Sequence, residues 1–157
     1  MTTEEKSTDR DLHRKFAVDT FNLVWELLDK QSRTPEEDDR MVHAAYASRF
    51  HWGEIGTPLE FARGEWQISR VYAVLNRPQP ALYRAQRSLA LCQANRIGDF
   101  DLAFGYEALA RAYAVAGDGS TATEYIGKAR LAGELIEDDG NREYFLGELA
   151  SVSDLLK

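Results

Sequence analysis

The stretch that decides the fold is residues 106–129, YEALARAYAVAGDGSTATEYIGKA. Its apolar residues recur at intervals of three and four, as on one face of an α-helix, and the pattern breaks once, at the Gly-Asp-Gly sequence of residues 117–119. Two helices joined by a tight turn explain both features. Leu109 and Tyr113 then share one face of the first helix, and small residues beside them allow the two backbones to approach.

The rest of the chain repeats these helical signals and contains no alternating pattern typical of a β-strand. Thr-Pro-Glu-Glu at residues 34–37 and Thr-Pro-Leu-Glu at residues 57–60 each combine a capping box with proline at the first helical position, so each predicts the start of a helix. We predict about seven helices in one domain spanning residues 10–157, after a disordered tail at residues 1–9. The predicted antiparallel hairpins cover about 11–53, 58–97 and 100–136, and a terminal helix covers 141–156.

Composition excludes several classes of protein. The formal net charge of −7 argues against a nucleic-acid surface, which needs clustered lysine and arginine. No apolar run reaches the roughly 18–20 residues that cross a bilayer, and the polar N-terminus does not resemble a signal peptide, so we expect a cytoplasmic protein with no membrane partner. The single cysteine, Cys92, lies on the apolar face of a predicted helix, where we expect a buried and inert thiol.

An internal repeat supports the hairpins. The runs RVYAV and RAYAV place Tyr72 and Tyr113 41 residues apart, and Ala81 and Ala122 keep the same offset. We therefore expect Tyr72 and Tyr113 to occupy equivalent buried positions. Truncation of a fully buried tyrosine at residue 113 would cost about 3–5 kcal/mol of stability.

The spacing of these residues resembles the tetratricopeptide repeat, with Tyr106 in the place of the repeat's tryptophan. Residues 62–135 resemble two divergent, lengthened repeats, and residues 11–53 a degenerate first one. The period of 41 exceeds the usual 34, so each helix should gain about one turn, and helix pairs of the HEAT type have similar periods. Residues 51–75 also resemble uncharacterised bacterial proteins of this kind, which implies no activity. The resemblance implies an all-α, TPR-like superhelix that binds a protein or peptide in a groove lined by the first helix of each hairpin.

The resemblance also implies which residues line that groove. They are Arg63, Trp66, Arg70, Phe104, Glu107 and Arg111. Two arginines at equivalent positions, beside exposed aromatic rings, could grip a carboxylate or phosphate of a peptide. This role requires at least one arginine without a carboxylate partner, and replacement of Arg70 and Arg111 by alanine should then abolish binding without changing the melting temperature. The alternative is that Glu107 and Arg111 form an intrahelical ion pair and that Arg70 stacks on Trp66.

A second candidate site involves histidine. If the first two helices are antiparallel about residue 33, His13 comes level with His51, near Glu54. A metal or catalytic cluster of His13, His51 and Glu54 is then conceivable. The alternative is that His51 packs at the end of the first hairpin, and we expect the two imidazoles to be well separated, which would exclude the cluster.

From these observations we predict an interaction module that is not an enzyme and has no cofactor. Two other functions remain open: a small-molecule or metal-binding helical protein centred on the histidines, and a structural protein that self-associates into a homo-oligomer. The sequence does not name the partner.

Overall fold

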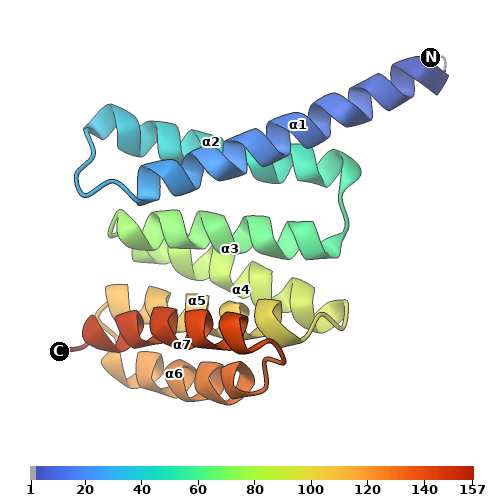
Figure 1. Ribbon diagram of the computed structural model, residues 1–157. Helices are drawn as coiled ribbons and strands as arrows, with labels where there is room; N and C mark the ends of the chain where they lie inside the picture. Colours follow the sequence, from blue (N-terminus) through green and yellow to red (C-terminus); the bar gives the residue numbers. More distant parts are fainter. Residues whose placement is uncertain (1–2) are drawn as a thin grey trace.

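The computed structural model describes residues 3–157, and over that range the chain forms seven α-helices and no β-strand. The helices are α1 (Thr3–Leu28), α2 (Pro35–Ile55), α3 (Pro58–Val74), α4 (Pro78–Ala94), α5 (Asp99–Val115), α6 (Gly119–Glu134) and α7 (Asp139–Asp154). The hairpins α1–α2, α3–α4 and α5–α6 stack in chain order, and α7 packs against α5 and α6 (Figure 1). The prediction of an all-α fold of stacked helical hairpins is confirmed.

The two capping boxes begin the helices that they predict. Thr34 Oγ1 accepts a hydrogen bond from the Glu37 N–H at 3.2 Å, and the Thr34 N–H donates to the Glu37 carboxylate at 3.1 Å. The Thr57 N–H donates in the same way to the Glu60 carboxylate at 3.3 Å. These bonds satisfy backbone donors that the first turn of a helix leaves without intrahelical partners.

The first helix is longer than its sequence pattern indicates. α1 begins at Thr3, so residues 3–9 are helical where we predicted a disordered tail. Residues 1 and 2 of that tail lie outside the described part of the chain. These residues are polar, but a polar segment can extend a helix. Once a helix is nucleated, each added residue gains a backbone hydrogen bond whether or not it buries an apolar side chain.

The 41-residue offset is visible in the backbone as well as in the side chains. Ala81 and Ala122, which lie early in the second helices of successive hairpins, are both fully buried. Asn76 and Gly117, in the turns that precede those helices, both have a left-handed backbone, with φ of 59° and 82°. Equivalent turns and equivalent helix contacts therefore recur in α3–α4 and α5–α6.

Tyr72 and Tyr113 also occupy equivalent positions, but both are only half-buried. The Tyr72 hydroxyl lies 3.0 Å from that of Tyr46, and burial raises the pKa of Tyr72 to about 12. Tyr113 stacks on Tyr125 with ring centroids 5.6 Å apart. The cost expected for a fully buried tyrosine at residue 113 is thus too high, because part of its ring stays in contact with water.

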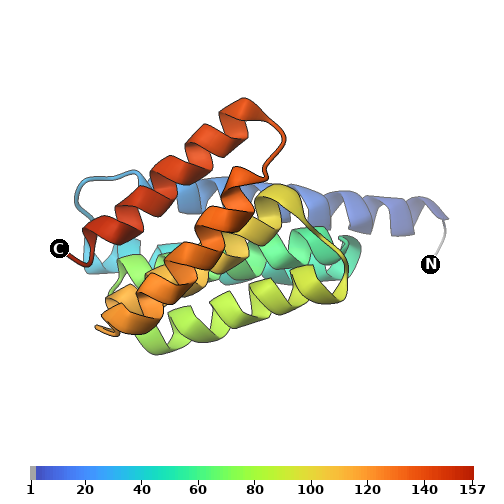
Figure 2. The same ribbon diagram turned by 90° about the horizontal axis from the view of Figure 1, so that it is seen from below.

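The first helices of the hairpins form one side of the stack together with α7. Figure 2 shows α1 and α7 on the same side of the molecule, although they lie at opposite ends of the chain. Among the described residues, no helix is long and apolar enough to cross a membrane.

Candidate functional site

A cavity of about 150 Å³ opens on the side of the stack that carries α1, α3, α5 and α7. We call it the aromatic pocket, because six of its ten lining residues carry aromatic rings. The lining residues are Phe21, Trp25, Ala62, Arg63, Trp66, Ser88, Phe100, Asp101, Phe104 and Tyr144. An apolar cavity of this volume accommodates a group the size of benzene.

Helical spacing places the rings of the pocket. Phe100 and Phe104 are one turn apart on α5, with centroids 4.7 Å apart in an edge-to-face arrangement. Phe21 and Trp25 are one turn apart on α1, with centroids at 6.3 Å. Trp66 of α3 lies between the two pairs, 5.7 Å from Trp25 and 5.4 Å from Phe104. Rings from three helices therefore form one continuous wall.

One ion pair lies at the edge of the pocket. Arg63 donates to both carboxylate oxygens of Asp101, at 2.8 and 3.1 Å. The Arg63 side chain is 51% exposed, whereas that of Asp101 is only 16% exposed. The arginine therefore has room to move into solvent, while the carboxylate is held beside the pocket.

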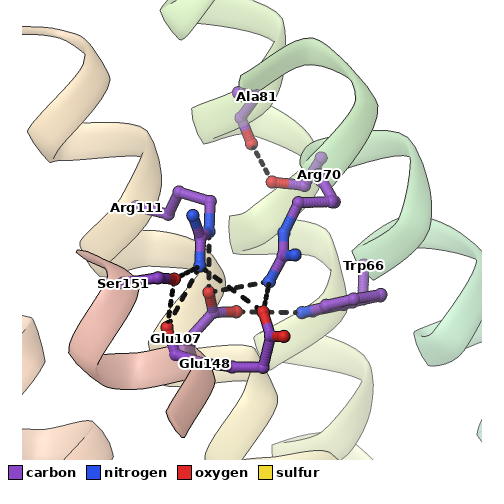
Figure 3. Close-up of polar contacts among 8 residues, drawn as sticks. Trp66, Arg70, Ala81, Glu107, Arg111, Glu148 and Ser151 are labelled. Carbon is purple, nitrogen blue, oxygen red and sulfur yellow. Dashed lines mark hydrogen bonds and ion pairs between the residues drawn. The ribbon is translucent and has the colours of Figure 1, made fainter. Parts of the chain in front are cut away.

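A second group of charges lies beyond Trp66 and is centred on Glu107, which is only 1% exposed (Figure 3). One oxygen of its carboxylate accepts hydrogen bonds from Arg70 at 3.1 Å and from Arg111 at 2.8 Å. The other accepts a bond from the indole N–H of Trp66 at 3.2 Å. Since Trp66 and Glu107 are 41 residues apart, equivalent positions of successive hairpins bind each other directly.

Helix α7 completes this group of charges. Arg70 donates to the Glu148 carboxylate at 3.1 Å. Arg111 donates to the Glu148 backbone carbonyl at 3.2 Å and to the Ser151 hydroxyl at 2.8 Å. We call Arg70, Glu107, Arg111 and Glu148 the Glu107 cluster. Its two positive and two negative charges balance, and it fastens α7 to α3 and α5.

The six residues predicted to line a groove therefore come together, but in two different settings. Arg63, Trp66 and Phe104 line the aromatic pocket. Arg70, Glu107 and Arg111 lie in the Glu107 cluster, largely shielded from solvent.

The expectation of a free arginine was wrong, because all three predicted arginines have carboxylate partners. Both alternative interpretations describe real contacts. The Glu107–Arg111 ion pair forms within α5, and the Arg70 guanidinium lies 5.0 Å from the centre of the Trp66 ring. The condition for the two arginines to hold a carboxylate or phosphate is therefore not met, and a role in binding stays a prediction for the residues that line the aromatic pocket.

Sequence reasoning identified three of the ten residues that line the pocket and missed the other seven. Phe21 and Trp25 belong to the apolar stripe of α1, and Tyr144 precedes the stripe of α7, so no feature of the sequence distinguishes them from ordinary packing residues. The carboxylate partners Asp101 and Glu148 gave no local signal, because their arginines lie 38 and 78 residues away.

The Tyr144 hydroxyl lies in an acidic part of the site. Partial burial raises the pKa of Tyr144, and the Glu148 carboxylate raises it further. Glu107 and Asp29 act in the same direction, and Arg70 acts against them. The groups named as causes of this shift, Glu148, Arg70, Glu107 and Asp29, all lie beyond the wall of the pocket.

The histidine pair forms at the predicted register. The Nδ1 atoms of His13 and His51 are 2.9 Å apart, so one ring donates and the other accepts a hydrogen bond. Our expectation of well-separated imidazoles was therefore wrong. Burial lowers the pKa of His51, the charge of His13 lowers it further, and Glu54 opposes both. Among the described residues, however, no three histidine, cysteine or acidic side chains are grouped as metal ligands, so Glu54 does not complete a site.

Cys92 is buried, as predicted. Burial raises the pKa of its thiol to about 11, so the thiolate needed for nucleophilic attack is scarce at neutral pH.

No protein-family model, curated protein or solved structure gives a significant match to this chain. The resemblance to tetratricopeptide repeats therefore rests on the spacing of residues alone, and function has to be argued from the site.

Proposed function

We propose that this protein is a cytoplasmic interaction module, without catalytic activity, that binds a protein or peptide segment across α1, α3, α5 and α7 and takes one side chain into the aromatic pocket. The observation that supports this most is the origin of the pocket wall: rings from four helices, spread over residues 21–144, meet at one cavity. Aromatic residues dominate the energetics of protein interfaces, and pockets that receive one anchoring side chain are typical of them.

The charges around the pocket fit binding better than catalysis. Arg63 pairs with Asp101, and the Glu107 cluster is satisfied within itself. General acid–base catalysis needs a proton donor or acceptor within reach of a substrate, and these side chains are already committed to one another.

Two tyrosines allow a matched test of this function. Tyr144 lines the pocket and is 52% exposed, whereas Tyr83 lies on α4 outside the pocket and is 54% exposed. Peptides selected from a random display library on the wild-type protein would be titrated against Tyr144→Ala and Tyr83→Ala, with the fluorescence of Trp25 and Trp66 as the readout.

We expect Tyr144→Ala to weaken binding about tenfold or more, as for an aromatic hot spot, and Tyr83→Ala to leave it unchanged. Equal melting temperatures of the two variants would show that the fold is intact. Selected peptides that bind both variants as tightly as the wild type would overturn the proposal, because their site would lie elsewhere.

A further inference from the structure

The chemistry of the aromatic pocket narrows the kind of group that it takes. Ala62 is the only aliphatic residue in its lining, whereas six lining residues carry aromatic rings. Aliphatic and aromatic walls both receive hydrocarbon groups, but the negative faces of aromatic rings also attract cations within about 6 Å. Cages of such rings are used to recognise quaternary ammonium groups.

Rings in this protein already bind cations. The Arg70 guanidinium lies over Trp66 at 5.0 Å, outside the pocket, and Arg49 lies over Phe61 at 4.5 Å. Arg84 contacts two rings, those of Tyr46 and Tyr83, at 5.3 and 5.0 Å. An arginine is held on an aromatic face in each case, which shows that the electrostatic environment of the stack tolerates a cation at a ring.

The net charge of the protein also favours a cation. Arg63 and Asp101 neutralise each other in the lining, the charges of the neighbouring Glu107 cluster balance, and the chain as a whole carries a formal net charge of −7. An acidic protein raises the local concentration of cationic ligands. Two positive charges oppose a cation: that of Arg63, which is half-exposed and can move away from the pocket, and that of Arg70, which lies beyond Trp66 and is paired with Glu107 and Glu148.

The polar groups of the lining distinguish an alkylated ammonium from a plain one. A lysine ammonium carries three N–H donors and is strongly hydrated, so it needs oxygen acceptors when it loses water. The lining offers few oxygen acceptors: the Ser88 hydroxyl, which donates to the Ala62 carbonyl at 2.9 Å, the Asp101 carboxylate, which is already paired with Arg63, and the half-exposed Tyr144 hydroxyl. A trimethylammonium group has no N–H donors, so it enters this cavity without leaving any unsatisfied.

We propose that the aromatic pocket binds an alkylated ammonium group, such as the side chain of trimethyllysine, carried by the peptide partner. A trimethylammonium group is close in size to benzene and so fits a cavity of about 150 Å³. This inference rests on the proposed function, and it adds the chemical class of the side chain that the pocket receives.

The first test separates charge from shape. Choline and its neutral isostere 3,3-dimethylbutan-1-ol differ only in nitrogen against carbon at the branched centre, and each would be titrated by tryptophan fluorescence and calorimetry. We expect choline to bind about tenfold more tightly, as a desolvated cation–π contact predicts. Equal affinity of the two, or no binding of choline, would overturn the proposal.

The second test uses two variants that change affinity in opposite directions. Tyr144→Ala should weaken choline binding about tenfold, with Tyr83→Ala as the unchanged control. Arg63→Gln should strengthen choline binding about threefold or more, because it removes one opposing charge and leaves Asp101 facing the pocket. The same variant should leave the neutral isostere unaffected. Weaker choline binding in Arg63→Gln would contradict the proposed electrostatics.

Peptides then separate this proposal from the proposed function. Otherwise identical peptides carrying lysine or trimethyllysine would be compared, and we expect a preference of about tenfold for the methylated form. If choline binds as described but neither peptide does, the alkylammonium site stands and the peptide-binding function fails. If the unmethylated peptide binds as tightly as the methylated one, the function stands and the alkylammonium site fails.

Discussion

Two regions of the molecule are each built around a buried glutamate that pairs with two arginines, and they differ in how these charges are surrounded. Glu107, on α5, joins Arg70 and Arg111 beside the aromatic pocket. Glu65, on α3, joins Arg49 of α2 at 3.3 Å and Arg84 of α4 at 3.2 Å, and we call these three residues the Glu65 cluster.

The two clusters differ in the balance and the exposure of their charges. The Glu107 cluster has two carboxylates for two arginines, and its arginines are only 11–12% exposed. The Glu65 cluster has one carboxylate for two arginines, which are 24% and 27% exposed and lie over aromatic rings. Arg70 also lies over a ring, that of Trp66, so what distinguishes the Glu107 cluster is its second carboxylate and its lower exposure to water.

The largest effect is expected from Arg70→Ala/Arg111→Ala. This double variant leaves Glu107 buried without its cationic partners, and such a loss costs about 3–5 kcal/mol. Urea denaturation followed by circular dichroism would measure it. This corrects the sequence-based expectation of an unchanged melting temperature, and it makes the variant unsuitable for a binding test. A double variant as stable as the wild type would show that water reaches Glu107.

Replacement of the three most buried members of the Glu107 cluster, with the part-exposed Glu148 retained, supplies the control. A variant with Arg70→Met, Glu107→Leu and Arg111→Leu leaves no unpaired charge among these three residues and should recover most of the lost stability, because apolar packing often equals a buried ion pair. If this variant does not regain stability, the fit of the original side chains rather than their charge holds α7 in place.

A smaller effect is expected from Glu65→Ala. Its two arginines keep their ring contacts and can turn toward water, so we expect a loss of about 1–3 kcal/mol, as for a buried hydrogen-bond partner that is removed. The same urea titration would measure it. A loss equal to that of the Arg70→Ala/Arg111→Ala variant would remove the contrast between the two clusters.

A still smaller effect is expected from Glu148→Gln, which keeps a hydrogen-bond acceptor on α7 but removes its charge. The Glu148 side chain is 28% exposed, so solvent weakens its ion pair and the expected cost is about 1 kcal/mol or less. In this variant, amide hydrogen exchange should accelerate more in α7 than in α5, relative to the wild type. Unchanged exchange throughout α7 would show that its apolar residues alone fix it.

The smallest effect is a pH dependence that neither cluster explains, since neither contains a histidine. The pKa of His51 is lowered in the folded state, so this imidazole is neutral in both states above its ordinary value of about 6.5. As the pH falls below that value, the unfolded state takes up the proton more readily, and stability is lost until the pH passes the folded pKa. The melting temperature of the wild type should therefore fall between pH 7.5 and 5.5.

Two histidine variants isolate this dependence. His51→Gln should fall less steeply with pH than the wild type, whereas His43→Gln, on the same helix and exposed, should follow the wild type. Parallel curves for His51→Gln and the wild type would remove the histidine pair from the explanation.

The sequence predicted those features that depend on local spacing. Counting residues along the sequence was enough to find the capping boxes at Thr34 and Thr57 and the 41-residue offset. It also predicted that His13 and His51 lie at the same height in the first hairpin. The separation of the two imidazoles was predicted wrongly because counting fixes the level of a residue and leaves the direction of its side chain open.

Most residues of the site that could be predicted from the sequence stand at positions that recur with the 41-residue offset. Trp66, Arg70, Glu107 and Arg111 occupy repeated positions and were identified together. The contribution of α7 was missed because Tyr144 and Glu148 lie outside the repeats, and no spacing in the sequence relates them to Arg70. Tertiary partners from non-repeated segments have to be seen in the structure.

The ion pair between Arg70 and Glu148 also has a consequence for folding. It joins residues 78 apart and links the second hairpin to the last helix across α5. In an ideal array of repeats each unit contacts only its neighbours, and the ends can unravel independently. Here the last helix is tied to an earlier unit, so its detachment also disturbs α3. Loss of α7 should therefore also loosen α3, which an ideal array of repeats would leave undisturbed.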